Sequence, residues 1–444
     1  MKRWLVGLLV LAALVVFVSP GIVGRLAERG MEEGLSQPAG PGAEFVVTQE
    51  RFRRGWFSAA GRHRVEFADG LLHDLLAALA GEAPPGANPA LVVETRVDHG
   101  LVPFTSLGRE AGSLLPALAR TESTLALDLG RGATQPLPAK LFTTLGVSGA
   151  TSSRLELEPG ALRERGGSLA WGDGEVTFGT DARGLELSWQ GAVEEPRAVT
   201  DAGSAGATGL RYEGRAAKTV YGYSVGRVTL ALDSLELEPA AGHPAIDLDT
   251  LRFDGKSEIG GERYAGQGTL VLERLAVPGL GPLDADVAAR LAGVHAPGLG
   301  RLLALLETLA ERDGQALGGD PWPALTGELR TLLSAGGVLE VERFGLTLPE
   351  GPLSATLELA LPERPPGEAP LQWPSLLLAL TGSADLELPV AVAERLLEIH
   401  PDAALLVATG MLVRRGEQYV LEARYAQGVV TVNGAPLPIP LPGR

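Results

Sequence analysis

The sequence contains no cysteine, and this absence removes several classes of chemistry at once. Disulfide frameworks, cysteine-ligated zinc, iron–sulfur clusters and thiol catalysis are excluded. Aromatic residues are also scarce, at 5% of the chain, whereas 59 glycines and 32 prolines make turn-forming residues frequent. This mixture is typical of many short strands joined by tight turns, and it disfavours a compact helical enzyme.

Basic residues are outnumbered, because 54 acidic and 38 basic side chains give a net charge of −16. A nucleic-acid-binding protein needs a positive field to replace the counterions of its ligand, so no nucleic-acid partner is expected. Hydrophobic residues still make up 45% of the chain, which is enough to bury a sizeable core.

Motifs for metals and cofactors are missing as well. The histidines do not show the paired spacings that hold zinc; they are His63, His73, His99, His243, His295 and His400. The acidic pairs 247/249 and 284/286 lack the third acid and the glycine loop of a calcium site, which favours surface carboxylates. No metal and no cofactor are therefore predicted.

One catalytic motif is present in the sequence. Residues 222–226 read G-x-S-x-G, the motif around a hydrolase nucleophile, with Ser224 at its centre. In hydrolases this turn is followed by a helix, which places the serine above the helix N-terminus. Here residues 227–238 alternate between apolar and polar side chains like a strand. The pattern favours a strand or hairpin serine, so no enzyme is predicted and a serine hydrolase is only a remote alternative.

The start of the chain carries its longest apolar run. Lys2 and Arg3 precede an uncharged stretch from Trp4 to Gly24. About 20 apolar residues at ~1.5 Å each cross a ~30 Å hydrocarbon core, and the positive start favours a cytoplasmic N-terminus with the rest translocated. The alternatives are a cleaved signal peptide, for which residues 18–21 form a poor cleavage site, and a buried core helix. We expect a single-pass membrane anchor.

Beyond the anchor, alternation with a period of two residues recurs along the chain. It occurs in Thr124–Leu129, Ser153–Glu158, Leu185–Trp189, Val228–Glu238, Val338–Glu342, Leu353–Leu361 and Asp385–Leu388. Such strands have one apolar and one polar face and belong to antiparallel sheets. The predicted fold is mainly β with minor α: an N-terminal transmembrane helix, then an elongated, largely antiparallel β assembly with a few packing helices.

Helical periodicity interrupts this alternating pattern in a few segments. The predicted helices are Leu71–Leu79, Pro138–Leu145, Asp286–Leu291, Leu299–Asp313, Trp322–Leu333 and Ala391–Ile399. The predicted organisation is a cytoplasmic tip and anchor (1–24), a linker (25–43), a first β-rich region with short helices (44–283), a helical segment (284–337) and a second β-rich region with one helix (338–444).

A basic cluster stands out in the acidic chain soon after the linker. It comprises Arg51, Arg53, Arg54, Arg62 and Arg64. The pattern favours the solvated face of a hairpin; the alternative is contact with anionic phospholipid headgroups near the anchor. The neighbouring Trp56 and Phe57 are expected in the core, with the membrane interface as the alternative.

Three short sequence strings are distinctive beyond the chemical properties of their side chains. They are FRRGWFS at 52–58, with Arg54, Gly55, Trp56 and Phe57; VDHGLVPF at 97–104, with Asp98, His99, Gly100, Pro103 and Phe104; and YAQGVVTVNG at 425–434, with Tyr425, Gly428, Asn433 and Gly434. In order and position, together with the apolar start, they resemble the YdgA-like family of bacterial inner-membrane-anchored proteins of unknown function. The resemblance covers nearly the whole chain and implies a bacterial inner-membrane protein with a periplasmic body. It implies no catalytic residues.

The same strings have structural interpretations. Residues 54–57 are typical of a bulged strand with an aromatic packing point, and Asp98–Gly100 would end a strand in a turn. Asn433-Gly434 is the favoured pair for a tight turn. The alternative for all three strings is a shared binding surface.

Two functions are compatible with this organisation. The first is a non-enzymatic envelope protein that binds lipid or another apolar ligand along an amphipathic sheet. The second is an interaction or assembly protein that docks other envelope proteins through strand edges and helices. Expected partners are therefore the membrane, reached through the N-terminal helix, and either lipids or other envelope proteins.

Overall fold

The structure is a computed structural model that describes residues 45–67, 71–80, 88–100, 116–130, 134–240, 245–277, 281–311, 322–365, 368–399 and 404–437. The chain divides into two compact units. Unit 1 comprises residues 1–215 and 237–243, and unit 2 comprises residues 216–236 and 244–444. Each unit is described by itself.

Unit 1 is built almost entirely from antiparallel strands. Its elements are β1 (Phe45–Arg54), β2 (Ser58–Phe67), α2 (Leu71–Ala80), β3 (Ala90–His99), β4 (Ala119–Asp128), β5 (Thr134–Leu145), β6 (Thr151–Leu157), β7 (Gly160–Glu164), β8 (Gly167–Trp171), β9 (Gly174–Thr180), β10 (Glu186–Val193), β11 (Arg197–Thr200) and β12 (Gly203–Thr208); β13 (Leu210–Lys218) and β15 (Ser234–Pro239) contain residues of both units. The strands pair in the order β1-β2-β3-β4-β5-β6-β9-β10, and β7-β8-β11-β12 form a second run.

The main core cluster of unit 1 lies beneath α2. Leu76 of this helix packs with the buried side chains of Leu127, Leu129 and Leu162, and Trp171 packs against the cluster. The indole N–H of Trp171 donates to the backbone carbonyl of Glu158 at 3.0 Å, which satisfies the polar atom of a largely apolar side chain.

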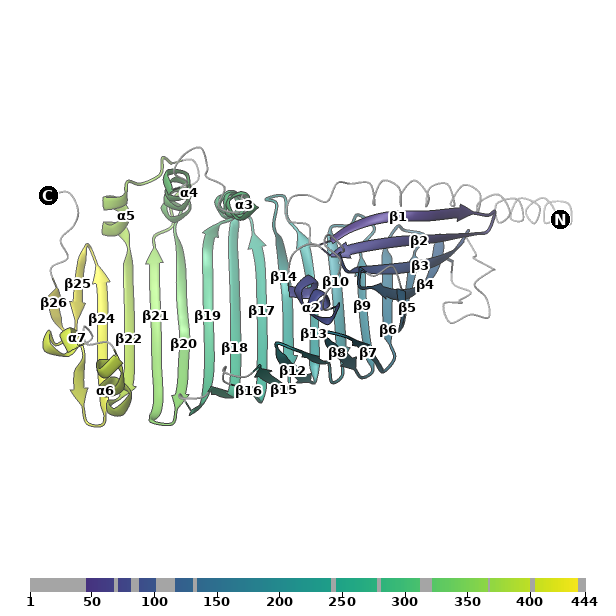
Figure 1. Cartoon of the computed structure of the whole chain (residues 1–444). Coiled ribbons are helices and arrows are strands. Elements are labelled where there is room, and N and C mark those ends of the chain that lie inside the picture. Colours follow the sequence, from purple (N-terminus) through teal and green to yellow (C-terminus); the bar gives the residue numbers. More distant parts are fainter. Residues whose placement is uncertain are drawn as a thin grey trace, which may run out of the picture. The chain divides into compact units, whose positions relative to one another are not determined.

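Unit 2 is a wide antiparallel sheet with helices at its ends (Figure 1). Its elements are β14 (Ser224–Leu232), β16 (Ile246–Leu248), β17 (Thr250–Gly260), β18 (Arg263–Val277), β19 (Gly281–His295), α3 (Ala296–Glu311), α4 (Trp322–Ser334), β20 (Gly337–Leu348), β21 (Gly351–Leu361), α5 (Trp373–Ala379), β22 (Thr381–Pro389), α6 (Val390–Ile399), α7 (Ala404–Ala408), β23 (Val413–Arg415), β24 (Gln418–Ala426), β25 (Val429–Val432) and β26 (Ala435–Leu437). The main strands pair in the order β14-β17-β18-β19-β20-β21-β22-β24-β25-β26.

The helices of unit 2 stand at the ends of the strands. Figure 1 shows α3, α4 and α5 at one end and α6 at the other. The α6 end contains a buried cluster in which Val392 and Ala393 pack with Leu388 of β22. At the first end α3 and α4 lie against β19, and at the other end α6 lies against β22 and β24.

The mainly antiparallel β fold with few helices confirms the predicted fold class in its coarse form. The predicted helices at 71–79, 299–313, 322–333 and 391–399 correspond to α2, α3, α4 and α6 wherever the structure describes them. Two predicted helices are wrong. Pro138–Leu145 belongs to β5 and Asp286–Leu291 belongs to β19, because each segment is paired with a strand on both sides, and this pairing overrides local helix propensity.

The predicted anchor, Trp4–Gly24, and the linker lie outside the described residues. Within the described ranges, no helix combines the length and the apolar character that crossing a bilayer requires. The transmembrane helix and the predicted division of the chain at residues 24, 43, 283 and 337 stay predictions.

Candidate functional site

One face of the unit 2 sheet carries mainly apolar side chains. Directly opposed residues of an antiparallel pair share a face, so the strand registers define rows of side chains that cross the sheet. One such row consists of Phe253, Leu270, Val287, Phe344, Ala355, Leu386 and Leu421. The next rows on the same face consist of Gly255, Gly268, Ala289, Val341, Leu357, Ala384 and Ala423, and of Ser257, Gly266, Leu291, Leu339, Leu359, Gly382 and Tyr425. We call these three rows the apolar face.

Solvent reaches the apolar face. Phe253 is 37% exposed, Leu339 40% and Phe344 37%, and the other members of the rows are half-buried. Apolar side chains in a protein core are normally almost fully buried. This face is therefore open rather than filled by a second layer of the described chain.

The opposite face of the same sheet is polar. Its exposed side chains form cross-strand ion pairs such as Arg227–Asp254 at 3.0 Å, Arg343–Asp286 at 2.7 Å and Arg424–Asp385 at 3.0 Å. The sheet thus separates a charged side from an apolar side, as the alternating sequence predicted.

Aromatic rings lie along the apolar face instead of standing up from it. A Cβ atom added at Gly255 would meet the ring of Phe253 at 3.1 Å, and one added at Gly266 would meet the hydroxyl of Tyr264 at 2.6 Å. These rings cover neighbouring glycines, an arrangement that also protects the sheet backbone. The middle row of this surface has glycine or alanine at five of its seven positions, the exceptions being Val341 and Leu357.

The first family-like string forms a hairpin turn rather than the predicted bulged strand. Gly55, Trp56 and Phe57 connect β1 to β2, and the Gly55 N–H donates to the Ser58 carbonyl at 2.7 Å. The irregularity in pairing lies earlier, between Gln49 and Arg51. Trp56 is 60% exposed, so its expected place in the core is wrong; it lies at the tip of the hairpin, where most of its side chain is open to solvent.

The second string extends β3 further than predicted. Asp98 and His99 belong to the strand and are buried on opposite faces, and only at Gly100, with a φ of 123°, does the chain turn away. Asp98 lies directly opposite the buried Arg120 of β4. The structure gives Asp98 an ion pair with Arg96, at 3.8 Å, and burial lowers the pKa of Arg120. Pro103 and Phe104 lie outside the described residues.

The third string contains two tight turns. Gln427 and Gly428 join β24 to β25, and Asn433 and Gly434 join β25 to β26; all four residues have positive φ. This geometry is typical of two-residue hairpin turns and confirms the predicted Asn433-Gly434 turn. The Tyr425 hydroxyl donates to the Leu377 carbonyl at 2.7 Å and thereby fixes the end of α5.

Asn433→Ala is expected to lower the free energy of unfolding of unit 2 by about 2–3 kcal/mol. The Asn433 side chain donates to the carbonyls of Gly410 and Met411, both at 3.0 Å, and accepts the Glu422 N–H at 2.9 Å. Asn433→Gly keeps the positive φ but loses these bonds, so chemical denaturation should place it between wild type and Asn433→Ala. Equal stability of all three proteins would contradict this role.

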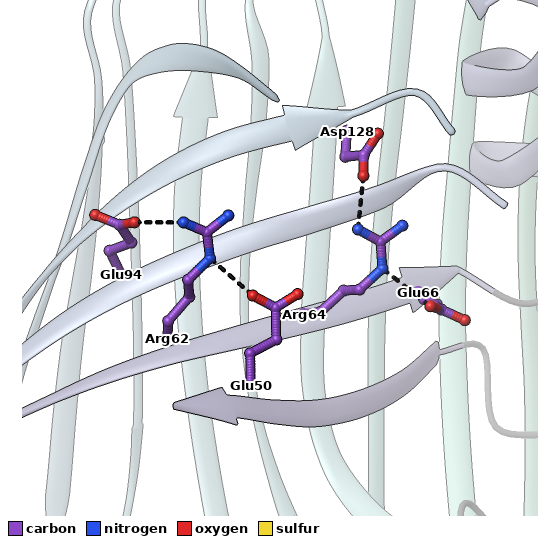
Figure 2. A network of polar contacts seen from close by, with 6 residues as sticks. All are labelled: Glu50, Arg62, Arg64, Glu66, Glu94 and Asp128. Carbon is purple, nitrogen blue, oxygen red and sulfur yellow. Dashed lines mark hydrogen bonds and ion pairs between the residues drawn. The ribbon is translucent and has the colours of Figure 1, made fainter. Parts of the chain in front are cut away.

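The arginines of the basic cluster lie in different environments. Figure 2 shows that Arg62 and Arg64 are neutralised by carboxylates from other strands. Arg62 contacts Glu50 at 2.8 Å and Glu94 at 2.9 Å, and Arg64 contacts Asp128 at 2.6 Å and Glu66 at 3.0 Å. Both arginines are therefore ion-paired on the sheet, and Arg64, with 23% of its side chain exposed, is only partly solvated.

Arg51 and Arg53 behave differently. Both are exposed, and within the described ranges the structure gives neither an ion pair. They line a hollow of about 830 Å³ together with Arg96 of β3 and Lys140 of β5. Sequence reasoning missed Arg96 and Lys140, since only the registers β2–β3, β3–β4 and β4–β5 bring them to the cluster.

A buried histidine next to this cluster makes the stability of unit 1 dependent on pH. The Nε2 atom of His63 has no hydrogen-bond partner among the described residues, and burial lowers the pKa of His63. The unfolded chain therefore binds a proton near pH ~6.5 that the folded chain does not yet bind, so stability falls as the pH drops below that value.

We expect the unfolding midpoint of the wild type to fall between about pH 7 and about pH 5, and His63→Leu to reduce that fall. A His63→Leu variant with the same pH profile as the wild type would contradict this role of His63. Thermal melts at several pH values measure this. Burial also lowers the pKa of His295, so the fall should shrink rather than vanish.

The remaining chemical candidates have structural explanations. Ser224 is exposed at the start of β14, so a strand follows the G-x-S-x-G string where a hydrolase has a helix. Asp249 pairs with Arg274, and Asp284 accepts the Arg274 N–H at 2.7 Å. In the part of the chain that the structure describes, no group of three or more potential ligand side chains could hold a metal ion.

Comparison with known proteins places this fold in a family. The family model described as "Bacterial protein of unknown function (DUF945)" matches residues 1–440, and the chain belongs to this family. Among curated proteins, "Protein YdgA" of Escherichia coli (strain K12) is 24% identical over 282 residues. The match covers 58% of this chain and 53% of that protein, so the chain spans about half the length of the curated relative. No solved structure matches.

Proposed function

We propose that this chain is a non-enzymatic envelope protein that is anchored in the bacterial inner membrane by residues 4–24 and binds lipid acyl chains along the apolar face of unit 2. The observation that carries the proposal is the exposure of Phe253, Leu339 and Phe344 on the apolar face. Exposed apolar surface of this extent marks a ligand, membrane or protein contact.

The dimensions of the apolar face suit an acyl chain. A row of seven residues crosses seven strands, and a spacing of ~4.8 Å between strands makes it roughly 30 Å long. That length equals the hydrocarbon thickness of a bilayer, and one acyl chain spans about half of it. Each buried CH₂ group contributes about 0.8 kcal/mol, so even partial coverage of one chain supports binding.

The test is the lipid content of the purified full chain. After exchange into a detergent and delipidation, incubation with bacterial lipids followed by native mass spectrometry should show phospholipid or other acyl chains retained on the protein. A preparation that takes up none of them would remove the proposal.

The proposed topology has its own test. In spheroplasts, protease added from outside should cut the chain near the exposed Arg51 and leave the N-terminus protected. Cleavage of the N-terminus with protection near Arg51 would reverse the orientation and exclude a periplasmic body.

The alternative proposal is an interaction or assembly protein of the envelope. It is favoured by exposed apolar side chains on the helices of unit 2, which include Trp322 of α4, Leu378 of α5 and Leu405 of α7. Helices of this kind dock partner proteins through an apolar surface. Cross-linking in cells that returns only the chain itself would weaken this alternative.

A further inference from the structure

The hollow on unit 1, which we call the basic groove, is a second candidate site, and it is independent of the apolar face. We propose that the basic groove binds a phosphate group, carried either by an anionic lipid headgroup or by a small soluble molecule. The inference rests on unit 1 alone and does not depend on the proposed function.

The groove is built by strand register. On one face of unit 1, Arg51 lies opposite Arg62, Arg62 opposite Glu94, and Glu94 opposite Thr124, which in turn lies opposite Lys140. The adjacent row on this face contains Arg53, Ala60, Arg96 and Glu122. Five strands thus contribute side chains to one surface of the unit.

Basic side chains outnumber acidic ones in the lining of the groove. The lining contains five basic residues, at positions 51, 53, 62, 96 and 140, and the two acidic residues Glu94 and Glu122. Arg62 is already paired with Glu50 and Glu94, and Arg96 lies 3.8 Å from Asp98. Within the described ranges the exposed Arg51 and Arg53 form no ion pair, so their positive charge is available to an anion.

The exposed arginines of the groove suit a phosphate ligand. Arg51 lies directly opposite Arg62 across β1 and β2, and Arg62 is already neutralised by Glu50 and Glu94. Arginine binds phosphate through two parallel N–H···O bonds, and Arg51, Arg53 and Arg96 are exposed. A bound phosphate would receive such bonds from these side chains.

The floor of the groove leaves room for the ligand. Ala60 lies between Arg53 and Arg96 in its row, and the neighbouring Gly61 also lines the groove, so the small methyl group of Ala60 stands between two long basic side chains. A volume of about 830 Å³ is larger than one phosphate ion needs and lies within the range of small-molecule sites.

The exposed Trp56 favours a lipid as the source of the phosphate. It follows Arg53 by three residues at the tip of the hairpin that carries the groove. Indole rings concentrate at the level of lipid headgroups, where their apolar body and polar N–H are both accommodated.

The test uses the full chain in a neutral detergent and isothermal titration calorimetry with three probes. These are dihexanoyl-phosphatidylglycerol, dihexanoyl-phosphatidylcholine and sn-glycerol 3-phosphate. The first should bind at least about tenfold more tightly than the zwitterionic second, because each basic residue near the headgroup adds to the attraction. Binding of glycerol phosphate as tight as that of phosphatidylglycerol would assign the site to soluble phosphate compounds.

The matched variants change the same number of charges at different places. Arg51→Glu with Arg53→Glu should weaken phosphatidylglycerol or glycerol phosphate binding by at least about tenfold. Arg183→Glu with Arg252→Glu alters two exposed arginines that do not line the groove and should change it by less than about twofold. If the first pair does not fold, Arg51→Gln with Arg53→Gln replaces it, with an expected loss of at least about threefold.

Two results would overturn the inference. One is the absence of binding of both phosphatidylglycerol and glycerol phosphate to the wild type. The other is an equal loss of affinity in the groove variant and the control variant, which would show a general effect of net charge.

Discussion

Gly167→Ala should lower the free energy of unfolding of unit 1 by more than about 3 kcal/mol, the largest effect of any single methyl group that we expect in this protein. Gly167 begins β8 with a φ of 152°, which side-chain-bearing residues rarely adopt. Its Cβ would overlap the carbonyl oxygen of Val199 and lie 3.0 Å from the Cα of Thr200. Both are backbone atoms of β11, so no flexible side chain can move away.

The neighbouring strands hold that backbone in place. Val199 lies opposite Ser168 of β8 on one side and Ser204 of β12 on the other. Relief of the overlap would therefore break pairing on both sides of β11. Backbone strain of about 1–3 kcal/mol adds to overpacking of about 1–3 kcal/mol.

Gly184→Ala separates the contribution of backbone strain from that of overpacking. Gly184 also has a positive φ, of 67°, but an added Cβ would meet nothing within 4 Å. Its alanine variant should lose only about 1 kcal/mol. Hydrogen exchange of the amides of β8 and β11 measures the local effect in the full chain. Equal protection in the two variants would contradict the close approach at Gly167.

Phe253→Asp combined with Phe344→Asp should weaken binding of a fluorescent fatty acid to the full chain by more than about tenfold. Each phenylalanine contributes about 1.5–3 kcal/mol when a ligand covers it, and 1.4 kcal/mol corresponds to a factor of ten. A carboxylate on the apolar face would in addition lose its hydration beneath an acyl chain. The lost apolar contact and the lost hydration of the carboxylate therefore both weaken binding of the fatty acid.

The control places the same charges on the other side of the same sheet. Thr269 of β18 and Thr347 of β20 are exposed and lie in register positions of the polar face. Thr269→Asp with Thr347→Asp should leave the affinity within about twofold of wild type, because solvated charges that far from the ligand are screened. Loss of binding in both double variants would show that net charge or stability, rather than the apolar face, controls binding.

Sequence periodicity predicted most of the fold, because alternation is a direct consequence of side chains pointing to opposite faces of a strand. The runs at Val228–Glu238 and Leu353–Leu361 coincide with β14, β15 and β21. Pro138–Leu145 and Asp286–Leu291 were mispredicted since their composition is compatible with a helix and only pairing on both sides makes them strands. The short helix α5 was missed because seven residues carry too little periodicity.

The candidate sites were less predictable than the fold. Alternation indicated that apolar faces exist, but it did not show whether a second layer fills them; the exposure of Leu339 and Phe344 gives that answer for unit 2. The sequence predicted that Arg51 and Arg53 belong to a basic cluster. Lys140 could not be predicted, because it lies almost ninety residues after Arg51 and reaches the cluster only through strand pairing. Trp56 was misplaced because an aromatic residue after a glycine does not reveal whether it lies at a hairpin tip.

The most direct test of the proposed function is photocrosslinking from single positions of β20 in living cells. A photoreactive amino acid at Leu339 lies on the apolar face, and one at Thr347 lies on the opposite face of the same strand. We predict that position 339 yields lipid adducts by mass spectrometry and that position 347 yields none. Adducts at 339 that contain only protein, or equal lipid adducts at both positions, would contradict an apolar face that binds acyl chains.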